Sequence, residues 1–213
     1  MIGQILIKAY NSLKMNGIDV SHWNGKIDWK AVKTGNIPAV EFAYIKCSTA
    51  SGSMDEKALF NSTEAKKAGV KVGYYHYASL NTDSEVEDAT QEANWFIQCI
   101  KKLPSSDLPL ALDLEDPKKV LTLDPFEVET WVKTFFSVLE KNGYKNYVLY
   151  SYTPYLNTNL PNNHSLGNIP LWIAQYRTTL TLPKGWNKSW MWQYSDKGAV
   201  KGIIGKVDLN KQI

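Results

Sequence analysis

Hydrophobic residues follow two alternating patterns up to about residue 143, one typical of short buried strands and one typical of helices with a single buried face. Apolar runs predict strands at 17–23, 40–48, 71–78 and 108–115. Apolar residues at three- and four-residue spacing predict helices over 27–33, 55–68, 84–102 and 124–143. Because strand and helix alternate strictly, we expect parallel strands joined by crossover helices.

The last of these helices carries a clear start signal. Asp124, Pro125 and Glu127 suit the N-cap, the first helical position and the third helical position. The two acidic side chains can accept hydrogen bonds from backbone N–H groups that have no partner within the helix. Gly143 suits the end of the helix, because glycine readily adopts the backbone conformation found there.

The second part of the chain keeps the strands but loses the helical pattern. Four further runs predict strands at 147–154, 170–176, 190–195 and 206–210. The connections between them are rich in Asn, Pro, Gly and Thr rather than in helix formers. The eight strands predict an α/β fold, an irregular (β/α) barrel whose later half lacks outer helices. With no internal repeat and no linker, we expect one barrel domain over 16–213 after an N-terminal arm or leader over 1–15.

Composition and charge argue against several classes of function. The formal net charge is only +3, and the lysines are scattered rather than gathered with aromatics into a nucleic-acid groove. No segment approaches the ~20 apolar residues of a membrane span. Three histidines and no cysteine pair at ligand spacing argue against a zinc site. We expect a monomer with no metal, no cofactor, no nucleic-acid partner and no membrane span.

Two further features concern the environment of the protein. Cys47 and Cys99 could form one disulfide, but buried free thiols are the more frequent state in a chain of this size. The segment 1–14 has an apolar patch only at 5–7, which is too short for the core of a signal peptide. We therefore expect delivery to the site of action by cell lysis or by a dedicated system.

The stretch PLALDLEDP, residues 109–117, ends an apolar run in carboxylates. Active sites of parallel barrels lie at the carboxyl ends of the strands. Residues two apart on a strand share a face, with Cα atoms ~6.6 Å apart. We therefore expect Asp113 and Glu115 to point into one mouth, with Leu114 turned to the opposite side. A lone D-x-E pattern also fits a helix cap or a surface turn. The prediction of a site at a strand end therefore depends on the apolar run before it.

Other predicted strand ends carry acids, amides and aromatic rings. A pocket of this kind suits glycoside hydrolysis, which needs a proton donor of raised pKa and a second group that stabilises an oxocarbenium-like centre. Crowded carboxylates raise one another's pKa and so favour such a donor. The strand-end groups are Asp19, Ser21, His22, Trp23, Tyr75, His76, Tyr77, Tyr150, Tyr152, Trp172, Gln175, Tyr176, Trp192, Gln193, Tyr194, Asp208 and Asn210.

Several of these residues have structural alternatives. Asp19 could cap the following turn, and Asp208 could be a turn residue near the end of the chain. His76 lies in an aromatic run, where a hydrogen-bonded core histidine is more frequent than a catalytic one. The tryptophans and tyrosines could pack in the core or bind sugars.

Seven motifs occur in a fixed order: GIDVSHWNGKIDW, GYYHYA, LPLALDLED, YSYTPYL, LWIAQY, WMWQYS and KVDLN. Together they resemble glycoside hydrolase family 25, the lysozyme family of bacterial autolysins and phage endolysins, over roughly 15–213. The resemblance implies a catalytic domain, with no wall-binding repeat after it, that cleaves the β-1,4 bond between N-acetylmuramic acid and N-acetylglucosamine. The implied partner is a peptidoglycan glycan strand, and the implied location of action is the bacterial cell wall.

The resemblance also implies residue roles. Glu115 matches the general acid of the D-x-E motif, and Asp113 matches its partner, which acts on the substrate's 2-acetamido group or on the forming cation. Asp19 and Asp208 match the two acids that complete the cleft. The positions that line it in the family match Tyr77, Tyr150, Trp172, Tyr176 and Gln193, and we include His76 among the expected substrate-binding residues.

One departure and two rival functions accompany this prediction. Where the family usually shows K-A-T-E-G, the chain has Thr49 in place of the Glu, so a carboxylate of the groove is lost. A peptidoglycan-binding module without catalysis is an alternative, although Asp113 and Glu115 are retained. A metal-dependent barrel hydrolase is a further rival, for which too few histidines lie at strand ends.

The spacing of the acids predicts the stereochemical course. Inverting pairs stand roughly 6.5–9.5 Å apart across the sugar, and retaining pairs about 5–5.5 Å apart. Asp113 and Glu115 follow each other on one strand and so approach the substrate from a similar direction. We therefore expect retention through the substrate's own acetamido oxygen, with a nucleophile from another strand as the alternative.

Overall fold

Eight strands close into a barrel in the part of the chain that the computed structural model describes, residues 15–80, 84–115 and 123–213. The strands follow one another around it in the order β1-β9-β8-β7-β6-β5-β4-β2, and pairing of β2 with β1 closes the ring. The two-residue β3 (Ser53–Met54) adds a short hairpin to β2. The bounds of the barrel strands are β1 (Asn16–Val20), β2 (Phe42–Thr49), β4 (Lys71–Tyr77), β5 (Leu110–Asp113), β6 (Tyr147–Tyr152), β7 (Leu171–Ala174), β8 (Met191–Gly198) and β9 (Val207–Gln212).

The barrel confirms the expected fold class, but its last strand differs from the parallel arrangement that the alternation predicted. Strand β9 is antiparallel to both of its neighbours, β1 and β8. A parallel connection needs a crossover of a dozen or more residues, and the segment 199–206 between β8 and β9 is shorter than that. As a result, Asp208 lies at the beginning of its strand rather than at its end, and it pairs directly with Asp19 in β1.

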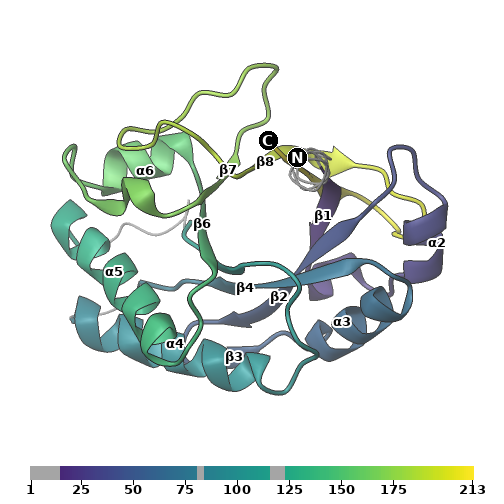
Figure 1. Ribbon diagram of the computed structural model, residues 1–213, viewed down its shortest axis with the longest axis horizontal. Helices are drawn as coiled ribbons and strands as arrows, with labels where there is room; N and C mark the ends of the chain where they lie inside the picture. Colours follow the sequence, from purple (N-terminus) through teal and green to yellow (C-terminus); the bar gives the residue numbers. More distant parts are fainter. Residues whose placement is uncertain (1–14, 81–83, 116–122) are drawn as a thin grey trace, which may run out of the picture.

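Helices cover the outside of the first part of the barrel. They are α2 (Trp29–Thr34), α3 (Ala58–Lys67), α4 (Glu85–Ile100) and α5 (Pro125–Lys141), and Figure 1 shows the last three along one side of the sheet. The expected capping box of α5 is present, since Asp124 accepts hydrogen bonds from two backbone N–H groups and Glu127 accepts one from Asp124.

The later half is poor in helices, as the sequence predicted. Beyond residue 147, where every residue is described, the connections hold only α6 (Thr153–Asn159) and the 3-10 turn η2 (Leu166–Asn168). The sequence pattern missed α6, whose first two residues fall within the strand expected at 147–154. Another short 3-10 turn, η1 (His22–Asn24), follows β1 directly.

Two hydrophobic cores lie on the two faces of the barrel wall. The larger one fills the space between the sheet and the helices, and the smaller one fills the barrel interior with Phe42, Tyr44, Trp172 and other side chains. Glycine is needed beside these rings, because a Cβ atom at Gly73 would lie 2.5 Å from the ring of Tyr44. The aromatic packing closes the barrel below its mouth.

Two further expectations concern cysteines and membranes. Cys47 and Cys99 are both buried and free, which agrees with the more frequent state expected for them. Among the helices described, none combines the length and apolar character that crossing a bilayer requires. The expected N-terminal arm lies outside the described residues, apart from Met15.

Candidate active site

The described residues form a cavity of about 300 Å³ at the carboxyl end of the parallel strands, and all four predicted acids line it. Lys46 is the only cationic side chain among these lining residues. The full lining is Asp19, Ser21, Trp23, Lys46, Tyr75, Tyr77, Asp113, Glu115, Tyr150, Trp172, Gln193 and Asp208.

Asp113 and Glu115 enter the cavity from the end of β5. Leu114 between them is buried in the outer core, so the two carboxyl groups share the inner face as their spacing predicted. Asp113 is buried, and its Oδ1 has no hydrogen-bond partner among the described residues. Burial, followed by the nearby Glu115, raises the pKa of Asp113 well above its ordinary value. Burial at this position therefore favours the protonated form of the carboxyl group.

Asp19 lies at the end of β1 and is held by two side-chain amides. Gln193 Nε2 and Asn210 Nδ2 donate hydrogen bonds of 2.9 and 2.7 Å to Asp19 Oδ2. Burial raises the pKa of Asp19, although these hydrogen bonds lower it in part. The amides thus fix the orientation of this carboxyl group.

Three aromatic side chains fix the amides in turn. The hydroxyls of Tyr150 and Tyr176 donate to Gln193 Oε1 over 3.0 and 2.8 Å, and Trp172 Nε1 donates to Asn210 Oδ1 over 2.8 Å. Each amide therefore uses its oxygen as an acceptor and directs its NH₂ group at Asp19. This network joins four of the predicted substrate-binding residues to one of the predicted acids.

Asp208 faces Asp19 across the β1–β9 pair. Burial, followed by the charge of Asp19, raises the pKa of Asp208 to about 8. Two carboxyl groups so placed do not readily ionise together, because like charges repel and no salt bridge with a cation joins either group among the described residues. Asp19 and Asp208 therefore behave as a coupled pair that retains a proton in neutral solution.

Lys46 was not singled out by the sequence, although it belongs to the cavity. Its ammonium nitrogen lies 4.6 Å from the centre of the Tyr77 ring, and its charge partly offsets the raised pKa of Asp113. The available signal was its period-two spacing behind Phe42 and Tyr44, which fill the barrel interior. Thr49, which replaces the family Glu, is not among the residues lining the cavity.

His76 does not lie in the cavity, so its expected role in substrate binding is wrong. Alternate residues of a strand face opposite sides, and Tyr75 and Tyr77 take the inner positions on β4. The His76 ring is buried in the outer layer, where it contacts Phe96 of α4 and Phe135 of α5. His76 is therefore a hydrogen-bonded core histidine, which was the alternative expected for it.

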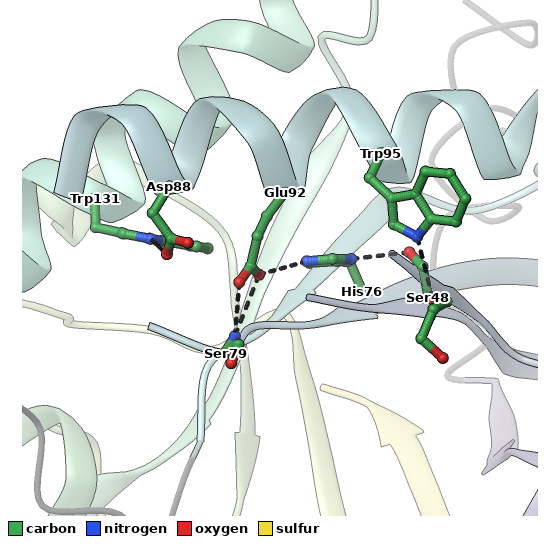
Figure 2. A network of polar contacts seen from close by, with 8 residues as sticks. Ser48, His76, Ser79, Asp88, Glu92, Trp95 and Trp131 are labelled. Carbon is green, nitrogen blue, oxygen red and sulfur yellow. Dashed lines mark hydrogen bonds and ion pairs between the residues drawn. The ribbon is translucent and has the colours of Figure 1, made fainter. Parts of the chain in front are cut away.

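The buried contacts of His76 form a network of their own, shown in Figure 2. The ring nitrogens lie 2.8 Å from Ser48 Oγ and 2.8 Å from Glu92 Oε2. Glu92 points from α4 towards the sheet and also accepts hydrogen bonds from the Ser79 backbone N–H. The network joins β2, β4 and α4 behind the cavity wall.

A second hollow of about 450 Å³ shares Glu115 and Tyr150 with the cavity. Tyr176 lines this hollow and not the cavity itself, although its hydroxyl reaches Gln193. At the cavity rim, Trp23 is 83% exposed and packs over His22, with ring centres 4.5 Å apart. The sequence places Trp23 at a strand end but does not show how far its side chain is exposed.

The described residues contain no group of three or more His, Cys, Asp or Glu side chains that could hold a metal ion. The four acids of the cavity are arranged instead as two pairs, Asp113 with Glu115 and Asp19 with Asp208. Such pairs can retain and transfer protons, which is the chemistry of acid catalysis at a glycosidic oxygen.

Comparisons with known proteins agree with this geometry. A family model described as "Glycosyl hydrolases family 25" matches residues 18–203. Lysozyme M1 of Streptomyces globisporus is 32% identical over 92% of this chain and 67% of its own length. The autolytic lysozyme of Clostridium acetobutylicum is 33% identical over 92% of this chain and 55% of its own length.

Solved structures share the fold. A bacterial lysozyme from Streptomyces coelicolor superposes with a TM-score of 0.82 and 30% identity, covering 95% of this chain and 93% of its own. The modular autolysin LytC of Streptococcus pneumoniae, solved with a synthetic peptidoglycan ligand, has a TM-score of 0.81 and 27% identity over 94% of this chain and 47% of its own. The chain therefore belongs to glycoside hydrolase family 25, the family of the muramidase lysozymes.

Proposed function

We propose that this protein hydrolyses the β-1,4 bond between N-acetylmuramic acid and N-acetylglucosamine in the peptidoglycan of bacterial cell walls. The observation that carries the proposal is the cavity that gathers Asp19, Asp113, Glu115 and Asp208 at the barrel mouth. The lysozyme relatives and the peptidoglycan ligand of LytC support this choice of substrate.

Glu115 is the proposed general acid. It lies where the cavity meets the second hollow, so a glycan that occupies both places a glycosidic bond beside it. Asp113 is its close neighbour, and burial favours the protonated form of this carboxyl group. We assign the pair one shared proton, which Glu115 delivers to the leaving oxygen while negative charge develops on Asp113.

The proposed course is retention through the acetamido group. The ionised Asp113 accepts a hydrogen bond from the acetamido N–H, and the acetamido oxygen attacks the anomeric carbon as the protonated leaving group departs. Glu115 then removes a proton from water, which attacks the same carbon and reopens the ring intermediate. Support comes from the common origin of both acids at the end of β5, because neither lies across the sugar from the other.

The remaining residues hold the sugar and the charge. Asp19 and Asp208 provide a second proton-sharing pair, and Lys46 partly balances the acids. The rings and amide proposed to contact the glycan are Tyr77, Tyr150, Trp172, Tyr176 and Gln193, since each lines the cavity or the adjoining hollow.

Incubation with isolated wall sacculi tests the proposal. We expect the suspension to clear, new reducing ends to appear in proportion, and neither change to depend on a chelator. Binding to the walls without release of reducing ends would contradict the proposal and support a non-catalytic binding module. For the stereochemistry, NMR of the first-formed anomer should show retention; an inverted product, or a covalent sugar adduct on Asp113, Asp19 or Asp208, would exclude the acetamido route.

A further inference from the structure

The hollow beside Glu115 has a wall that the proposed acid catalysis does not use. One side comes from the end of β6 and the start of α6, with Tyr150, Tyr152 and Thr153. The other side comes from the loop that follows β7, which includes Arg177. A substituent of the sugar beside the scissile bond would therefore meet this loop.

The loop is held in place by its own hydrogen bonds. Gln175 Oε1 accepts a bond of 2.7 Å from the Thr181 N–H, and Thr153 Oγ1 donates one of 2.8 Å to the Thr181 carbonyl. Trp192 Nε1 donates to the Gln175 carbonyl over 2.7 Å. These contacts hold the backbone at both ends of 176–180, the loop that carries Arg177.

Arg177 is the single arginine of the chain. It is exposed, and within the described residues it makes no hydrogen bond or ion pair that would occupy its guanidinium. It is also the only cationic side chain among the described residues lining the hollow. Lys46, the cation of the neighbouring cavity, already lies against the Tyr77 ring.

The surrounding charges are negative. Burial, followed by the charges of Asp208, Asp19 and other acids, raises the pKa of Tyr176 above its ordinary value. An anionic group entering the cleft is repelled by these acids everywhere except near a cation. A planar guanidinium can bind a carboxylate through two parallel hydrogen bonds, which a lysine ammonium cannot do.

We propose that Arg177 and the hollow around it form a subsite for a carboxylate carried by the muramyl side chain of the substrate. This inference rests on the proposed function. Muramic acid differs from glucosamine by a lactyl ether, whose carboxyl group is either free or extended by a peptide with carboxylates of its own. Both sources present the same chemistry to Arg177, and the hollow lies beside the acid that would cleave the adjoining bond.

Three soluble glycans distinguish a lactyl carboxylate from a carboxylate of the stem peptide. One carries intact stem peptides, one has been stripped by an amidase to free lactyl carboxylates, and one is the stripped glycan converted to neutral methylamides. The variants are Arg177→Gln, Arg177→Lys and the control Lys145→Gln, which removes an exposed positive charge from a hollow near the start of β5 and β6.

Arg177→Gln should raise KM by about 5- to 10-fold for a carboxylate-bearing glycan, with kcat changed less than about twofold, and should leave the methylamide substrate unaffected. The KM of Arg177→Lys for these glycans should lie between those of the wild type and Arg177→Gln. The KM of Lys145→Gln should match that of the wild type. The effect should shrink at high salt, because exposed charges are screened. The glycan that responds identifies the carboxylate as lactyl or peptidic.

An equal change in KM on all three glycans would show that Arg177 only balances the cavity acids, and no change on any would also overturn the inference. Calorimetry measures the affinity of the same glycans for Glu115→Gln and for the double variant Glu115→Gln/Arg177→Gln, without turnover. If Arg177→Gln selectively weakens binding of the carboxylate-bearing glycans in this measurement, the subsite is supported even without hydrolysis by the wild type. Absence of hydrolysis by the wild type would refute only the proposed function.

Discussion

Strand β4 separates two polar clusters that differ in how completely their atoms are paired. On its outer face, His76 bonds to Ser48 and Glu92 through both ring nitrogens (Figure 2). On its inner face, the barrel mouth holds Asp113, whose buried Oδ1 has no partner among the described residues. A buried polar atom without a partner destabilises a fold, so such an atom is expected where chemistry requires it. We therefore propose that the outer cluster stabilises the fold and that the inner cluster serves catalysis.

The largest effect is expected at the proposed proton donor. Glu115→Gln keeps the size of the side chain and removes the acid, so hydrolysis should fall by about 10²–10⁴-fold or more while the fold is unchanged. The rate of reducing-end release and the circular dichroism spectrum measure the two properties. Turnover near the wild-type rate by a folded variant would remove Glu115 from this role.

Asp113→Asn should lower the activity of the protein without lowering its stability. An amide cannot take up the negative charge that develops in the proposed mechanism, so we expect a loss of about 10²–10³-fold in activity. Stability at neutral pH should be equal to or higher than that of the wild type, because a desolvated acid is replaced by a neutral group. A clear fall in the melting temperature would show that Asp113 is a structural residue.

The outer cluster should respond in the reverse way. Glu92→Gln leaves a buried partner unsatisfied and should lower the free energy of unfolding by about 2–4 kcal/mol, as measured by urea denaturation. Glu87→Gln, an exposed change of the same charge on α4, is the matched control. The kcat of the folded Glu92→Gln protein should stay within about threefold of the wild type; a loss comparable to that of Asp113→Asn would break the division between the clusters.

The inner acids should also give stability a characteristic pH dependence. Burial raises the pKa of Asp208 to about 8 and raises the pKa values of Asp19 and Asp113 above ordinary. The folded state then binds more protons than the unfolded state between about pH 4 and pH 8, so these groups lower stability as pH rises through that window. In Asp208→Asn the free energy of unfolding should decline less steeply with pH than in the wild type. The difference in slope should be at most about 1 kcal/mol per pH unit, because the Asp208 side chain is partly exposed. Parallel decline in both proteins would contradict the raised pKa.

The smallest effect is expected from the two thiols. Cys47 and Cys99 are buried in the outer core, and neither lines the cavity. Replacing both with Ala should leave kcat/KM within about twofold and should cost only the stability of two small apolar contacts. An inactive but folded double variant would show that the outer core also controls the chemistry.

The sequence predicted the site best where all the polar residues of a strand lie on one face. In LALDLE, apolar residues precede the acids, so period-two spacing was enough to bring Asp113 and Glu115 to one side. In GYYHYA, aromatic residues occupy both faces, because the barrel interior is as apolar as the layer under the helices. The pattern therefore could not tell that His76 points outwards.

The contacts between distant strands lay beyond any local pattern. The position of Asn210 beside Asp19 depends on the antiparallel entry of β9, which follows from the short connection after β8. The role of Lys46 depends on which residues surround it across the barrel. Periodicity indicates the face of a strand, but the neighbours across a closed barrel depend on the order and direction of all eight strands.

Mass analysis of fragments from defined peptidoglycan shows whether the inner acids cleave the muramyl bond. The wild-type protein should release fragments whose new reducing end is N-acetylmuramic acid, and Glu115→Gln at the same concentration should release none above background. Fragments that end in N-acetylglucosamine, release of peptides alone, or equal release by Glu115→Gln would contradict cleavage of the muramyl bond by these acids.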